Sequence, residues 1–98
     1  MSSRNQRLNK EQRKQAIVFY NALSFARTAL QEGKLLENVK SEVKNIVERE
    51  PGVRLEYFEV ADSLNLILLD NVSDSERPIM CIAGYVGDVR LIDNLFVY

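Results

Sequence analysis

Two short polar clusters, at opposite ends of the chain, hold the side chains best suited to chemistry. The chain opens Met1-Ser2-Ser3-Arg4-Asn5, and near its other end it reads Arg90-Leu91-Ile92-Asp93-Asn94. Hydroxyl and backbone N–H groups can donate hydrogen bonds to phosphate oxygens, and a guanidinium can hold two such oxygens at once. The first cluster therefore predicts a phosphate contact. Its alternative is a polar chain end without a function.

The second cluster allows two interpretations. Asp93 is a carboxylate that could act as a base or a metal ligand, with Arg90 and Asn94 beside it. The structural interpretation is favoured: a hairpin strand in which Asp93 and Asn94 form a side-chain hydrogen-bond cluster or an edge that contacts another domain. Tyr57 and Tyr85 are interpreted as core aromatics with hydrogen-bonded hydroxyls rather than as reactive phenols.

Histidine is absent from the chain, which removes the commonest general base and the commonest metal ligand. The single cysteine, Cys81, lies within the apolar run Ile79-Met80-Cys81-Ile82-Ala83 and predicts a buried, inert thiol. One cysteine cannot form an intrachain disulfide or a cysteine-based metal site. Any chemistry here must use other side chains or those of a partner.

Length and charge exclude several classes of protein. The 98 residues suit one compact domain, and the net charge of −1 argues against a general nucleic-acid or membrane-surface role. Charge is uneven, because residues 1–14 carry five basic side chains against Glu11. The start of the chain could therefore bind an anion. No apolar run is long enough to span a membrane and no signal-peptide core is present, so a cytoplasmic location is expected.

The spacing of apolar residues predicts two helices in the first half of the chain. The first should run from about Lys10 to Glu32, and Gly33 supplies the left-handed residue that ends many helices. The second should run from roughly Leu36 to Glu50 as an amphipathic helix that covers a sheet. Pro51-Gly52 then stops it.

The first helix carries two apolar stripes, which we expect on opposite sides of the helix. The first stripe comprises Ala16, Phe19, Tyr20, Leu23, Ala26 and Leu30, and the second comprises Val18, Ala22, Phe25 and Ala29. A two-layer domain can cover only one of them. The second stripe would then contact another domain or a second copy of the chain, unless later segments cover it.

Three strands are predicted in the second half. They run from Val53 to about Asp62, from Pro78 to about Val86, and from Val89 to about Val97, with Gly87-Asp88 as a hairpin turn and an irregular connection at 63–77. Two helices followed by three strands predict an α+β fold. We expect a two-layer sandwich in which both helices pack on a three-stranded antiparallel sheet.

The order of these elements resembles the C-terminal domain of the pantothenate synthetase (pantoate–beta-alanine ligase) family. In that family an M-S-S-R-N loop opens the domain, a long helix follows, a V-D-Y-like strand lies midway and R-L-I-D-N lies near the end. The matching segments are Met1-Ser2-Ser3-Arg4-Asn5, Leu55-Glu56-Tyr57-Phe58-Glu59-Val60-Ala61-Asp62 and Arg90-Leu91-Ile92-Asp93-Asn94. The chain departs from the family where Glu56 replaces a frequent aspartate and in the loop at 70–77.

The resemblance implies that residues 1–98 are the C-terminal lid domain of an ATP-dependent ligase. That ligase condenses pantoate with beta-alanine through pantoyl-adenylate, with Mg²⁺ assisting the phosphates. Met1, Ser2, Ser3 and Arg4 would bind ATP, although Ser3 stands where the K-M-S-K-S loop of related nucleotidyl transferases has a second lysine. The family's catalytic histidine motif belongs to an N-terminal Rossmann-like domain, which is expected as the partner of this chain. Alone, the chain is expected to be inactive, with no catalytic residue or metal ligand of its own.

An alternative from a different class remains open. The basic start could belong to a small interaction module that binds an acidic or nucleic-acid partner. Its weakness is the overall charge and the lack of aromatic residues among the basic ones. Salt-dependent titration with RNA would separate the two hypotheses.

Overall fold

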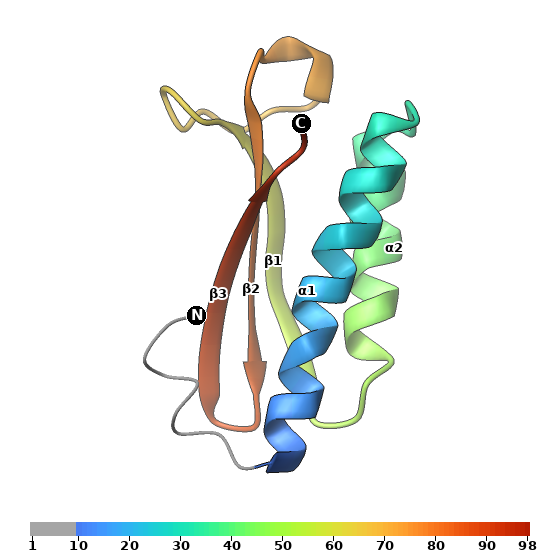
Figure 1. The fold of residues 1–98 in the computed structure, drawn as a ribbon, viewed down its shortest axis with the longest axis vertical. Helices are drawn as coiled ribbons and strands as arrows, with labels where there is room; N and C mark the ends of the chain where they lie inside the picture. The colour runs from blue at the N-terminus through green and yellow to red at the C-terminus, as the bar shows by residue number, and fades with distance from the viewer. Residues whose placement is uncertain (1–9) are drawn as a thin grey trace.

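A computed structural model describes residues 10–98, which form two layers (Figure 1). Both helices lie on one side of the sheet, so the predicted α+β fold is confirmed. The sheet is antiparallel with strand order β1-β2-β3. The elements are α1 (Lys10–Gln31), α2 (Leu36–Glu48), β1 (Val53–Asp62), the short 3-10 helix η2 (Val72–Asp74), β2 (Pro78–Val86) and β3 (Val89–Phe96).

Both helices end close to their predicted residues. After α1, Gly33 has φ +92° and donates its N–H to the Leu30 carbonyl, while Lys34 donates to the Ala29 carbonyl. These two bonds are the Schellman motif, which satisfies the last carbonyls of a helix. The predicted end of α2 at Glu50 was two residues too long. Pro51 follows Glu50, and a proline disfavours helical angles in the residue before it.

The sheet is joined by a tight hairpin and distorted by one bulge. Gly87, with φ +58°, stands in the turn between β2 and β3, as predicted. The register of β1 against β2 shifts between Leu55 and Tyr57. The break in alternation from Phe58 to Ala61 has a different cause, because Val60 and Ala61 are both buried although they are neighbours along the strand.

The core lies between the helices and the covered face of the sheet. Leu23, Met80 and Ile82 are its largest fully buried side chains. Gly84 is needed at the centre of this packing, because a Cβ there would lie 2.5 Å from a ring carbon of Phe19 and 2.5 Å from the Arg54 carbonyl oxygen. A bare backbone at this position therefore lets the Phe19 ring lie directly on the sheet.

The two apolar stripes of α1 do not lie on opposite sides of the helix. Ala22 and Ala29 are buried in the same core as Phe19 and Leu23, and Val18 and Phe25 pack partly buried against it. At 100° per residue the centres of the two stripes are about 120° apart, so they merge into one broad face. The stripe Val18, Ala22, Phe25 and Ala29, predicted to contact another domain or a second copy, is therefore covered at its two alanines and keeps only the partly exposed side chains of Val18 and Phe25. Tyr20, at the margin of the face, is 56% exposed.

None of the helices in residues 10–98 lies on the other face of the sheet, which we call the open face (Figure 1). Tyr57, Tyr85 and Cys81 lie on this open face and are half-buried. The expectations of core tyrosines and of a fully buried cysteine were therefore wrong, because alternation along β1 and β2 places these residues away from the helices. Partial burial still raises the pKa of the Cys81 thiol.

A loop at residues 63–69, called the leucine loop below, projects at the end of the sheet opposite the start of α1 (Figure 1). Four of its apolar side chains are mainly exposed: Leu64, Leu66, Ile67 and Leu68. Its last residues turn back along β1, where Leu69 donates to the Val60 carbonyl and Leu68 forms a bridge with Ala61. Within residues 10–98, no helix is long and apolar enough to cross a membrane.

Candidate functional site

The predicted phosphate-binding residues Met1, Ser2, Ser3 and Arg4 lie outside the described residues. The described chain begins at Lys10, the first residue of α1. Among the described residues, Lys10 is the one nearest in sequence to the predicted site. The contacts around it show how the fold holds the start of α1.

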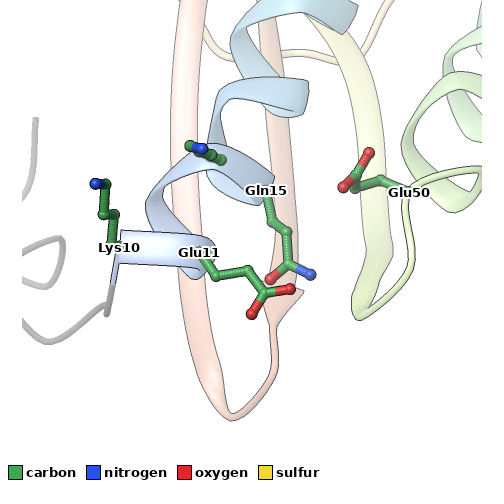
Figure 2. Close-up of a pocket in the computed structure, with 5 residues that line it drawn as sticks. Lys10, Glu11, Gln15 and Glu50 are labelled. Atoms are coloured by element: carbon green, nitrogen blue, oxygen red, sulfur yellow. The ribbon is translucent and has the colours of Figure 1, made fainter.

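An open hollow of about 610 Å³ lies beside the start of α1. Lys10, Glu11, Lys14 and Gln15 of α1 line it together with Glu50 (Figure 2). Two lysines face two glutamates, so the described lining has no net charge. A phosphate group here would need added positive charge, and in the sequence Arg4 and Arg7 precede this hollow.

Contacts between separate elements hold the first turns of α1. The Gln15 amide donates to the Pro51 carbonyl at 2.7 Å, between atoms Nε2 and O. Gly87 donates its backbone N–H to the Gly52 carbonyl at 3.1 Å and so joins the turn before β1 to the turn before β3. We call this set of residues (Gln15, Pro51, Gly52 and Gly87) the near end of the domain. It links the start of α1 to both turns.

Close packing reinforces the near end. Gly52 has φ +81°, and a Cβ there would lie 3.0 Å from Nε2 of Gln15. A Cβ on Gly87 would likewise lie 3.0 Å from Nε2 of Gln12. Glycine is thus favoured at both turns by its left-handed angles and by the glutamine side chains that pack against them.

A polar cluster lies across the open face beside the near end. Arg90 of β3 donates to Oε2 of Glu56 from Nε at 2.9 Å and from Nη2 at 2.6 Å. Tyr85 of β2 donates to Oε1 of Glu56 at 3.4 Å, and the Arg54 guanidinium lies 4.8 Å from the centre of the Tyr85 ring. The bulge before Tyr57 lets Glu56 reach across β2, so the pair connects both outer strands.

The negative charge of Glu56 in this cluster is paired with the positive charge of Arg90. The hydrogen bonds from Arg90 lower the pKa of the Glu56 carboxyl, aided by the charge of Arg90 and by the Tyr85 hydroxyl. The same hydrogen bonds raise the pKa of Arg90. Both groups therefore stay ionised over the neutral range, and neither is poised as an acid or base.

Arg90, Asp93 and Asn94 do not converge on one site. Arg90 and Asn94 belong to the open face, and alternation along β3 turns Asp93 to the other face. Oδ1 of Asp93 accepts the backbone N–H of Asn94 at 2.8 Å. The structural interpretation of this motif is supported, although the bond runs from a backbone group rather than between two side chains.

Acidic side chains in the described residues are too scattered to hold Mg²⁺. Nowhere in residues 10–98 do three or more His, Cys, Asp or Glu side chains gather around a common point. Glu56, on the open face, is already bound by Arg90. The described part of the chain therefore does not fit a resident metal ion.

Comparison with known proteins decides the family. The family model described as pantoate-beta-alanine ligase matches residues 1–96. The chain belongs to the pantoate–beta-alanine ligase family. Pantothenate synthetase of Akkermansia muciniphila is 40% identical over 95 residues, which cover 96% of this chain and 33% of that protein. The bifunctional pantoate ligase/cytidylate kinase of Trichodesmium erythraeum is 37% identical over 101 residues, which cover 99% of this chain and 19% of that protein.

A solved structure agrees with this assignment to the pantoate–beta-alanine ligase family. The crystal structure of pantothenate synthetase from Thermus thermophilus superimposes with a TM-score of 0.87 at 31% identity. The alignment covers all of this chain and 35% of that one. The chain thus spans about a third of the length of most relatives it matches.

Two functional features were missed from the sequence. Gln15 lies within a helix and bonds a turn 36 residues away, which no local pattern signals. Glu56 was noted only as a departure from the family, yet it is the partner of Arg90 in the R-L-I-D-N motif. No local signal marked it, because Glu56 continues the regular alternation of apolar and charged residues from Val53 to Tyr57.

Proposed function

We propose that this chain is the C-terminal domain of a pantoate–beta-alanine ligase and that it acts in the cytoplasm with an N-terminal Rossmann-like domain. The family match over nearly the whole chain is the observation that carries this proposal. The chain covers about a third of the relatives' length, which leaves room in such proteins for a larger second domain.

In the proposed reaction, a carboxylate oxygen of pantoate attacks the α-phosphorus of ATP. The bond from that phosphorus to the bridging oxygen breaks, and pyrophosphate leaves. The amine of beta-alanine then attacks the acyl carbon of pantoyl-adenylate, and AMP leaves as pantothenate forms. Mg²⁺ bound with the phosphates would offset part of their charge when present.

Within this reaction, the role of the present chain is to bring Met1, Ser2, Ser3 and Arg4 to the phosphates. Arg4 would stabilise the charge that develops on the departing pyrophosphate, and the serine hydroxyls would donate to non-bridging oxygens. Donors of this kind act only when they are already aimed at the transition state. The near end supports that requirement, because it holds the helix that directly follows these residues.

The role of Arg4 can be tested in a fusion that joins this chain to the preceding two thirds of the Thermus thermophilus relative. Arg4→Ala should slow pyrophosphate release in a pre-steady-state assay by about a hundredfold, as expected for loss of one charge-stabilising donor. Pantoate binding should change much less. Arg7→Ala removes the same charge three residues later and serves as the control.

Two results would count against this role. The first is pyrophosphate release at the parent rate in Arg4→Ala. The second is an equal loss in Arg7→Ala, which would point to general attraction of ATP by the basic start of the chain rather than to a specific contact.

A further inference from the structure

Strand β3 forms an outer edge of the described sheet. One hydrogen bond shows which backbone groups of β3 point toward β2 and which point away from it. The Val97 N–H donates to the Pro78 carbonyl at 3.0 Å. In antiparallel pairing, such bonded positions alternate with positions whose N–H and C=O groups point away from the neighbouring strand. By this alternation, Asn94 directs its N–H away from β2, toward the free edge.

This outward N–H already has an acceptor. Oδ1 of Asp93 lies 2.8 Å from the Asn94 nitrogen. Asp93 thus satisfies an edge amide that would otherwise be available to an added strand, and it places a negative charge on the same edge. A charge on an edge strand is a known protection against pairing with another chain. The occupied amide adds to it, because an amide that is already bonded cannot donate to an added strand.

The rest of this edge would favour such pairing. Ile92 is 54% exposed and Phe96 is 37% exposed, and by the same alternation both direct their backbone groups outward. Exposed apolar side chains beside unpaired amides make an edge strand a template for strand addition. Asn94 lies between them, at the middle of the free edge.

We propose that Asp93 is a guard residue that occupies the Asn94 amide and thereby keeps β3 from pairing with the β3 strand of a second copy of this chain. Two identical edges can pair antiparallel about a twofold axis. Such a pair would bring the two Asp93 carboxylates onto one short interface. Repulsion and the occupied amides together disfavour it.

The first test is sedimentation of the 98-residue chain over a range of concentrations. Asp93→Ala should lower the dissociation constant for self-association at least about tenfold, roughly the effect of one or two hydrogen bonds. Asp70→Ala removes the same charge from an exposed position outside the strands and should leave self-association unchanged. Equal association of both variants would overturn the proposal, as would an unchanged constant in Asp93→Ala.

Two further variants identify the amide as the point of control. Asp93→Asn loses the charge but keeps an oxygen acceptor for the Asn94 amide, so it should associate much more weakly than Asp93→Ala. The double variant Asp93→Ala with Asn94→Pro removes the amide itself and should reverse the association, since proline is tolerated at an outward edge position. Association of Asp93→Asn as strong as that of Asp93→Ala would contradict the guard mechanism.

Amide exchange gives a readout that does not depend on the folding of the proline variant. At concentrations where every variant is monomeric, the Asn94 amide should exchange more slowly in the parent and in Asp93→Asn than in Asp93→Ala. Equal exchange in all three would show that Asp93 does not hold this amide.

Discussion

The near end and the leucine loop lie at opposite ends of the domain and are held together in different ways (Figure 1). At the near end, the bonds run between elements, from Gln15 to Pro51 and from Gly87 to Gly52. In the leucine loop they are mostly local. There the side chain of Asp62 accepts the Leu64 N–H at 2.8 Å, and that of Asn65 accepts the Ile67 N–H at 3.0 Å.

The two sets of hydrogen bonds should therefore have different effects when they are removed. A change at the near end removes a link between α1 and the turns of the sheet, so its effect should spread to the start of the helix. A change before Leu69 in the leucine loop should stay local, because the apolar side chains from Leu64 to Leu68 are mainly exposed and only Leu69 belongs to the core. The segment proposed to bind ATP phosphates precedes the better-connected end.

Gly84→Ala should have the largest effect, because Gly84 faces Phe19 in the part of the sheet nearest to the near end. The new Cβ would lie 2.5 Å from both the ring and a backbone oxygen, and overpacking of this kind costs about 3 kcal/mol. Urea unfolding followed by circular dichroism measures the loss. Gly33→Ala is the control: no atom lies within 4 Å of its Cβ position, so only the left-handed φ costs energy, about 1 kcal/mol. Equal losses would contradict the packing argument.

Gln15→Ala should lower the free energy of unfolding by about 1 kcal/mol, the usual value for one hydrogen bond. Gln31 offers a matched comparison, since its amide donates to the Val97 carbonyl at the other end of α1. Gln31→Ala should cost a similar amount. Hydrogen exchange separates the two variants: only Gln15→Ala should speed exchange at the start of α1. Faster exchange there in both variants would remove the special role of the near end.

Leu66→Asn should stabilise the chain slightly, by about 0.5 kcal/mol. Leu66 has φ +60°, and asparagine adopts this region more readily than leucine. Little apolar burial is lost, because the side chain is 73% exposed. Thermal unfolding measures the gain, with Leu64→Asn as a control at an exposed residue that lacks a positive φ. A clear loss of stability in Leu66→Asn would show that the leucine loop packs more tightly than its exposure indicates.

The smallest effect concerns pH and the Glu56–Arg90 pair. Because the pKa of Glu56 is lowered in the folded state, the pair stabilises the fold above the ordinary glutamate pKa, and this contribution is lost as pH falls through the lowered value. Glu56→Gln should therefore flatten the decline of stability in acid relative to the parent. Unfolding curves at neutral and acidic pH test this expectation. An identical acid decline in both proteins would show that the pair does not couple to folding.

Much of the fold could be predicted because its signals are local. Gly33, Pro51 and Gly87 each mark an element boundary through their own backbone preferences, and the structure places boundaries there. The burial of both stripes of α1 was harder to predict, since a separation of about 120° on a helix is easily taken for opposite faces. Burial of Ala22 and Ala29 depends on how α2 and the sheet wrap around α1, which is tertiary information.

Features of the site that depend on long-range contacts could not be predicted from the sequence. The bond from Gln15 to Pro51 and the reach of Glu56 across β2 need the final register of the strands and turns. The role of Asp93 also depends on which side of β3 its neighbour's amide faces. The M-S-S-R segment was predicted from its residue types and the family resemblance, and it stays a prediction.

The proposed division of labour between the two domains can be tested by measuring pantothenate formation for the chain alone and for its fusion to the preceding two thirds of the Thermus thermophilus relative. We expect no product and no measurable ATP binding by the chain alone, and ATP-dependent pantothenate formation by the fusion. Product formed by the 98 residues alone would contradict the division of labour between the two domains.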